Sequence, residues 1–195
     1  MTRKTLTILI SLMLSAIAIA GEWHVDSSAE NLVKFTSSVS VLTFEGTTDK
    51  VDGYVYWEGD EMFKEKSQVY IEVDLNSVET GIGKRDRDMR DVLNAKEFPA
   101  TTFTGIFENA TAVEGMENAW NVTVKGIFMV NGAENEISVP GKITMENGRM
   151  HVVADFMILL NDYNIEAPSL AAFIKVAQEI KLNLDFYLKE QKGEE

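Results

Sequence analysis

Few residues of this chain have the types and spacing that chemistry requires. The two histidines, His24 and His151, do not form a metal-binding motif, so we expect no metal site and no cofactor. The segment 81–84, Gly-Ile-Gly-Lys, suggests a phosphate-binding loop, but Val78 stands where the Walker pattern needs a glycine. The chain has no Gly-x-Ser-x-Gly motif and no cysteine, which removes the serine nucleophile of that motif, cysteine nucleophiles, thiolate zinc sites and disulfides. We therefore predict no catalytic residue.

The densest positive charge lies on residues 83–98, a segment that the sequence predicts to be a short helix stopped by Pro99. Arg85, Arg87 and Arg90 are possible ligands for a phosphate or pyrophosphate head group, because arginine binds such groups with paired hydrogen bonds. The same helix also has opposite charges four residues apart, which is typical of a solvated surface: Lys84 with Asp88, Asp86 with Arg90, and Arg87 with Asp91. Both interpretations stay open, and such paired surfaces are the commoner case.

The first twenty residues have the pattern of a signal peptide. Arg3 and Lys4 precede an apolar run from Leu6 to Ala20, and the run ends in Ala-Ile-Ala. A run of about fifteen residues is shorter than the roughly 20 needed to span a bilayer. We expect cleavage after Ala20, export of the protein, and one domain over residues 21–195.

The composition fits one acidic globular domain, with 45% hydrophobic residues and 31 acidic against 18 basic residues. Loss of Arg3 and Lys4 with the signal peptide changes the formal net charge from −13 to −15. A negative field of this size repels phosphate backbones and anionic lipid surfaces. We therefore expect neither nucleic-acid binding nor stable membrane insertion.

Apolar and polar residues alternate with a period of two along most of the chain, which predicts half-buried β-strands. Asn131-Gly132 and Asn147-Gly148 are typical hairpin turns between such strands. We predict an all-β, eight-stranded antiparallel barrel with up-and-down connections, although a two-sheet sandwich would give the same pattern. The short helix follows the third long strand, and a loop with a helical turn, over Asp162 to Lys175 with Pro168-Ser169 and Leu170 to Ile174 in it, precedes the last one. The predicted strands are residues 33–41, 51–57, 67–75, 101–107, 120–130, 137–145, 150–158 and 180–188.

The inward positions of this barrel combine phenylalanines with very small residues. Small residues on an inward face leave volume unfilled, which would make an apolar tunnel; alternatively, the glycines mark bulges and bends in a filled barrel. The predicted cavity residues are Phe35, Val39, Gly53, Phe103, Phe107, Gly126, Phe128, Ala154 and Phe156.

An ordered set of segments gives the chain a resemblance to a known family. The segments are Asp74–Gly81, Arg85–Arg90, Phe98–Phe103 and Gly126–Gly132, with Trp23–Asp26 before them and Asp162–Ile165 after them. In this order they resemble the YceI family of exported proteins. The resemblance implies a lipocalin-like barrel in the periplasm with an elongated apolar cavity, and in some members a bound polyisoprenoid or other long amphiphile.

The sequence thus predicts a non-enzymatic periplasmic binding or carrier protein for a long apolar or amphiphilic molecule, a polyisoprenoid or a fatty-acyl lipid. Two alternatives remain open at this point. One is a cavity enzyme, an isomerase or hydrolase that uses a carboxylate. The other is a structural or stress-response protein with a filled barrel. The sequence does not define the oligomeric state or the ligand.

Overall fold

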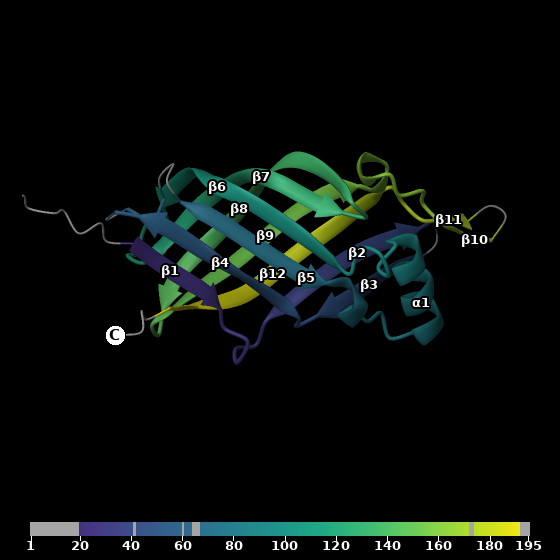
Figure 1. Cartoon of the computed structure of the whole chain (residues 1–195), viewed down its shortest axis with the longest axis horizontal. Coiled ribbons are helices and arrows are strands. Elements are labelled where there is room, and N and C mark those ends of the chain that lie inside the picture. Colours follow the sequence, from purple (N-terminus) through teal and green to yellow (C-terminus); the bar gives the residue numbers. More distant parts are fainter. Residues whose placement is uncertain (1–19, 41, 60, 64–66, 172–173, 192–195) are drawn as a thin grey trace, which may run out of the picture.

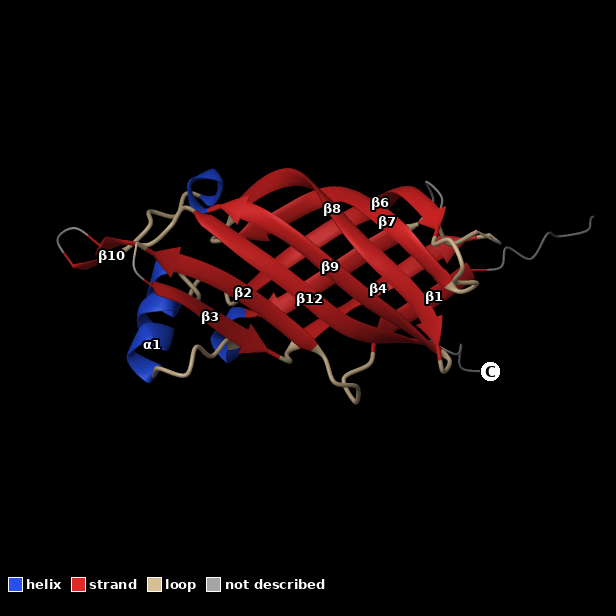
Figure 2. Cartoon of the chain, turned by 180° about the vertical axis from the view of Figure 1, so that it is seen from behind, coloured by secondary structure: helices blue, strands red, loops and turns tan. Residues whose placement is uncertain are grey.

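The computed structural model of the chain describes residues 20–40, 42–59, 61–63, 67–171 and 174–191 (Figure 1). The predicted signal peptide, residues 1–20, lies outside this part except for Ala20. Strands wind around an elongated body, and the one α-helix described lies at one end of it (Figure 2). None of the described helices is long and apolar enough to cross a membrane.

The strands that build the main sheet are β1 (Ala20–Val25), β2 (Leu32–Val39), β3 (Leu42–Thr48), β4 (Val51–Glu58), β5 (Gln68–Asp74), β6 (Ala100–Ala112), β7 (Ala119–Val130), β8 (Ala133–Glu146), β9 (Arg149–Leu159) and β12 (Glu179–Glu190). A separate hairpin consists of β10 (Ser169–Ala171) and β11 (Ile174–Lys175). The helical elements are η1 (Leu75–Ser77), α1 (Gly83–Val92) and η2 (Leu160–Tyr163).

Eight of these strands close into a ring in the order β1-β4-β5-β6-β7-β8-β9-β12, and every pairing is antiparallel. The ring closes where Trp23 and Val25 of β1 pair with Glu190 and Leu188 of β12. The predicted eight-stranded antiparallel barrel is therefore confirmed, although its ring contains β1, which was not predicted, and leaves out the predicted strand 33–41, which is β2. Its strands do not all follow one another as neighbours, because the β2–β3 hairpin comes between β1 and β4 in the chain and extends the sheet beside the other half of β12.

A loop from Asp26 to Asn31 divides this edge of β12 between β1 and β2. The backbone N–H of Asp26 donates to the carbonyl of Tyr187 at 2.7 Å. The Asn31 side chain then continues the pairing: its Nδ2 donates to the Asp26 carbonyl at 3.0 Å, and its Oδ1 accepts from the Tyr187 N–H at 3.0 Å. One buried amide thus satisfies backbone groups that the break in the strand would leave unpaired.

The carboxylate of Asp26 fixes the same loop and is almost fully buried, at 2% exposure. It accepts hydrogen bonds from the hydroxyl and the N–H of Ser28, and it pairs with Arg149 at 2.9 Å and Lys189 at 3.2 Å. The Ser28 hydrogen bonds and Lys189 outweigh burial and lower the pKa of Asp26 from 3.8 to about 2. Through these ion pairs, Asp26 connects the end of β1 to β9 and β12.

The structure also tests the predicted hairpin turns, the short helix and the helical turn. Asn131 and Gly132, like Asn147 and Gly148, have positive φ, as the predicted hairpin turns require. The helix after β5 is confirmed, but it ends at Val92, well before the predicted end. The helical turn predicted before the last strand is confirmed as η2, although it lies at Leu160–Tyr163, at the start of the predicted segment 162–175. The rest of that segment is extended, and its described residues form the β10–β11 hairpin.

Candidate ligand-binding cavity

Two adjoining cavities lie inside the barrel, a wide chamber of about 600 Å³ and a narrow chamber of about 120 Å³. Five residues border both of them, so the two chambers follow one another along one lumen. These residues are Val33, Val73, Thr101, Phe128 and Leu182.

The narrow chamber occupies the eight-stranded part of the barrel, and its described lining is apolar except for Thr101 and Thr102. Side chains close the lumen beyond it. Met150 and Leu188 are fully buried, and the Phe63 ring packs edge-on against Phe107 with centroids 5.1 Å apart.

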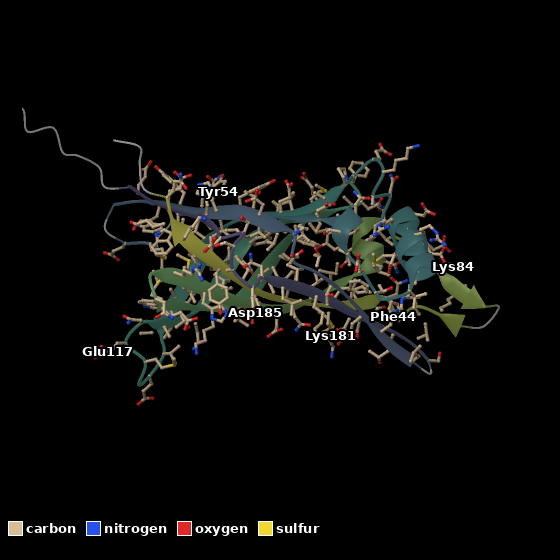
Figure 3. The ribbon with its side chains drawn as sticks, turned by 90° about the horizontal axis from the view of Figure 1, so that it is seen from below. Phe44, Tyr54, Lys84, Glu117, Lys181 and Asp185 are labelled. Atoms are coloured by element: carbon tan, nitrogen blue, oxygen red, sulfur yellow. The ribbon has the colours of Figure 1, made fainter. Side chains whose placement is uncertain are left out.

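The wide chamber lies at the α1 end, where the wall is made differently. β5 stops at Asp74, so the space between β3 and β6 is covered by η1, the segment 78–82 and α1. Among the described residues, one pair of backbone hydrogen bonds, between Thr47 and Glu79 at 2.9 Å each, joins this covering segment to β3. Leu42 and Ile82 on the chamber wall are more than half exposed, which marks the opening to solvent. Figure 3 labels Phe44 and Lys84, which both lie at this end of the molecule.

The segment before α1 is held by Asp86, a buried residue in the first turn of the helix. Its carboxylate accepts hydrogen bonds from the hydroxyl and the N–H of Thr80, and these bonds lower the pKa of Asp86 below its ordinary value. Asp86 therefore stays ionised and serves as a structural clamp. It is engaged by Thr80 rather than in the predicted pair with Arg90.

The positive cluster divides into three environments. Arg85 borders the wide chamber: its Nε donates to Thr80 Oγ1 at 2.8 Å, its Nη2 donates to the Thr80 carbonyl at 2.6 Å, and its Cζ lies 5.0 Å from the centroid of the Phe44 ring. Arg87 is exposed and Arg90 points to the Val78 carbonyl at 3.5 Å, and neither borders the two chambers. The predicted pair of Lys84 with Asp88 is confirmed at 2.6 Å. Of the three candidate head-group arginines, the structure brings only Arg85 to the cavity.

Seven of the nine predicted cavity residues border the lumen. Phe103, Phe107, Ala154 and Phe156 line the narrow chamber, Phe35 and Val39 line the wide one, and Phe128 lines both. Whether they contact a ligand stays a prediction.

Gly53 and Gly126 border neither chamber, and the prediction that they supply cavity volume is wrong. A Cβ on Gly126 would lie 2.2 Å from the Thr104 carbonyl oxygen, and one on Gly53 would lie 2.1 Å from the Tyr70 carbonyl oxygen. These glycines allow neighbouring strand backbones to approach closely, which is closer to the alternative reading of bulges and bends.

The two histidines lie away from the lumen. His151 contacts Asp185 at 2.7 Å and stacks on Tyr187 at 4.4 Å, and His24 contacts Glu22 at 2.7 Å. The part of the chain that the structure describes contains no group of three side chains placed to hold a metal ion.

Several cavity residues escaped the sequence analysis. They come from β3 and from the segment between β5 and β6, and include Phe44, Leu75, Val78, Ile82 and Met89. Ser37 was missed as well, although its parity with Phe35 and Val39 on β2 could have indicated it.

A closed antiparallel barrel with one apolar lumen, open beside a helix, defines the structural class of this protein. A family model, the YceI-like domain, matches residues 23–188, and the chain belongs to the YceI-like family. The resemblance inferred from the sequence is confirmed.

Similar proteins agree with this assignment. UPF0312 protein YE1254 of Yersinia enterocolitica is 27% identical over an alignment of 158 residues that covers 76% of this chain and 78% of that protein. Protein YceI of Salmonella newport is 27% identical over 152 residues, with the same shares.

Two solved structures share the fold. Burkholderia cenocepacia BcnA has a TM-score of 0.67 at 20% identity and covers 84% of this chain and 98% of its own. A polyisoprenoid binding domain from Saccharophagus degradans, implicated in plant cell wall breakdown, has a TM-score of 0.67 at 18% identity and covers 87% and 98%.

Proposed function

We propose that the protein binds and carries a long apolar or amphiphilic molecule, a polyisoprenoid or a fatty-acyl lipid, in the barrel lumen. The observation that carries this proposal is the apolar, two-chamber cavity. If one methylene occupies about the share of a water in the liquid, roughly 30 Å³, the wide chamber holds a chain of about twenty carbons and the narrow one about four more. A chain of this length, buried from water, gains about 0.8 kcal/mol for each methylene.

The relationship to a polyisoprenoid binding domain supports an isoprenoid or similar chain as the ligand. That structure shares the fold with this chain at low identity, so it supports the class of ligand rather than one compound. The apolar lining fits isoprenoid and straight acyl chains alike.

The chemistry of the lumen favours binding over catalysis. Among the described residues that line the chambers, Asp88 is the one acid, and it is exposed and paired with Lys84. A cavity isomerase or hydrolase would need a desolvated carboxylate inside, where its pKa would rise toward neutrality. The volume of the lumen also argues against a filled structural barrel.

Arg85 is the group best placed to meet a charged ligand head, since it stands at the opening and is oriented by Thr80 and Phe44. We test this with hexadecyl phosphate and hexadecanol, which differ only in the head group. Arg85→Gln should weaken binding of the phosphate more than binding of the alcohol. Arg87→Gln, outside the chambers on the same helix, is the matched control. The proposed head-group role of Arg85 is refuted if Arg85→Gln loses the same affinity for hexadecyl phosphate and for hexadecanol. It is also refuted if Arg87→Gln loses as much affinity as Arg85→Gln.

The binding itself is tested by thermal unfolding. A ligand at 100 times its Kd stabilises the native state by about 2.7 kcal/mol, which corresponds to a rise in Tm of roughly 5–10 °C for a domain of this size. If none of a panel of C12 to C26 alcohols and isoprenoids raises the Tm, the carrier function is refuted.

We further propose that this binding takes place in the periplasm, after cleavage of residues 1–20. The intact mass of the exported protein should be that of a chain that begins at Gly21. An exported protein that retains Met1 to Ala20 would contradict this localisation.

A further inference from the structure

One buried polar atom on the wall of the wide chamber has no partner among the residues that the structure describes. Ser37 is 3% exposed, and its Oγ makes no hydrogen bond with the described residues. Val33, Phe35 and Val39 alternate with it on the same face of β2, and all four border the lumen. The Ser37 hydroxyl therefore belongs to the inner wall of the cavity.

Two other hydroxyls on this wall, of buried Thr48 and half-buried Thr101, are paired. Thr48 Oγ1 lies 2.6 Å from Ser77 Oγ and also accepts the N–H of Lys50 at 2.9 Å. Thr101 Oγ1 donates to the Met129 carbonyl at 2.7 Å. Buried hydroxyls in folded proteins nearly always have a partner, and one left unsatisfied lowers stability. We therefore expect a molecule bound in the cavity to provide the hydrogen-bond partner of the Ser37 hydroxyl.

The position of Ser37 indicates what kind of partner this is. Ser37 on β2 lies opposite Phe44 on β3, and the Arg85 guanidinium lies over the Phe44 ring. The hydroxyl thus lies just inside the opening, one strand from the arginine. A charged group at this depth would lose its hydration and gain a single neutral hydrogen bond, which is unfavourable, whereas an uncharged oxygen would be satisfied.

We propose that Ser37 is a ligand-binding residue that hydrogen-bonds an uncharged oxygen of the bound molecule: a hydroxyl, carbonyl or ester group near one end of a long apolar chain. This inference rests on the proposed function of the lumen and narrows it. The cavity then selects oxygen-bearing amphiphiles over plain hydrocarbons.

The experiment compares hexadecanol with hexadecane, two chains of equal length of which only one carries an oxygen. Affinities are measured on wild-type protein and Ser37→Ala by displacement of the fluorescent dye N-phenyl-1-naphthylamine. Loss of one hydrogen bond should weaken hexadecanol binding about 3- to 10-fold and leave hexadecane binding unchanged. The ligand-free Ser37→Ala protein should have the same Tm as wild type or a higher one, because the substitution removes an unpaired buried hydroxyl.

Thr48→Val is the matched control, since it removes a paired hydroxyl from the same wall. It should lower the Tm of the ligand-free protein and should not distinguish the alcohol from the hydrocarbon. The proposal is overturned if Ser37→Ala affects both probes equally or neither of them. It is also overturned if Ser37→Ala lowers the Tm as Thr48→Val does, because Ser37 would then have a structural partner. If wild type binds both probes and Ser37→Ala has no effect, only this proposal fails; if wild type binds neither, the proposed function fails with it.

Discussion

Filling the narrow chamber should shorten the longest chain that the protein can bind. Ala154 lies on β9 in the wall of this chamber, opposite Gly141 of β8 and Leu184 of β12. The substitution Ala154→Leu adds three carbons, about 90 Å³ at roughly 30 Å³ each. The chamber has about 120 Å³, so leucine should fit without displacing its neighbours and should occupy most of the space.

The size of the effect follows from the displaced ligand. Three methylenes that can no longer enter lose about 0.8 kcal/mol each, about 2.4 kcal/mol in all, which weakens binding about 50-fold. The loss applies only to chains long enough to reach the narrow chamber, beyond about twenty carbons if the chain enters at the α1 end. Shorter chains, which end in the wide chamber, should bind Ala154→Leu as they bind wild type.

The assay is competition binding with straight-chain alcohols from C12 to C26. Affinity should rise with chain length in both proteins and level off about three carbons earlier in Ala154→Leu. Val153→Leu, the neighbouring outward position on the same strand, should behave as wild type. The same limiting length in Ala154→Leu and wild type would refute the reasoning, and so would a loss of about 1–3 kcal/mol in ligand-free stability, the mark of an overpacked core.

Two further predictions concern the barrel itself. Asp26→Asn should lower stability at pH 7 by about 2 kcal/mol, because folding lowers the pKa of Asp26 from 3.8 to about 2. That contribution is present above about pH 4 and is lost as the pH falls toward 2, so the Tm difference from wild type, followed by circular dichroism, should narrow over this range; a constant difference would contradict it. Gly126→Ala should lower stability by more than about 1 kcal/mol, since its Cβ would meet the Thr104 carbonyl, and folded protein should keep its affinity for hexadecanol. A Gly126→Ala protein with wild-type urea unfolding would show that the strands can move apart there.

The sequence predicted most of the strands whose inward faces are apolar, but it missed β1, although Trp23 and Val25 are buried there. Val69, Ile71 and Val73 of β5 are all buried, as their alternation required. β3 was missed because its inward positions, Leu42, Phe44, Gly46 and Thr48, are apolar only in the first half of the strand. A strand with small or polar residues on both faces lacks a clear hydrophobic alternation, so its sequence gives little indication that it is a strand.

The way in which the barrel closes could not be predicted from local patterns. The division of β12 between β1 and β2 depends on Asn31 and Tyr187, which are 156 residues apart in the chain. The buried charge of Asp26 likewise depends on Arg149 and Lys189, whose proximity only the fold creates. Such contacts leave no periodic trace in the sequence.

The candidate site shows the same limit. The alternation of side chains along each strand identified the phenylalanines of the lumen, because every second residue faces inward. It could not show that the backbones of β6 and β7 approach closely at Gly126, so a contact between strands was taken for cavity volume. It also could not identify Ser37, whose significance is the lack of a partner among the described residues in three dimensions.

The central claim, that the lumen carries a long-chain molecule, is tested most directly by the mass of the protein as the cell makes it. The full chain, expressed with residues 1–20 and purified from the periplasm without detergent, is measured by native mass spectrometry and then denatured to release what it holds. We predict an added mass that disappears on denaturation and belongs to a long-chain lipid, of about twenty to twenty-four carbons along its chain and with at least one oxygen. The mass of the polypeptide alone, before and after denaturation, would contradict it.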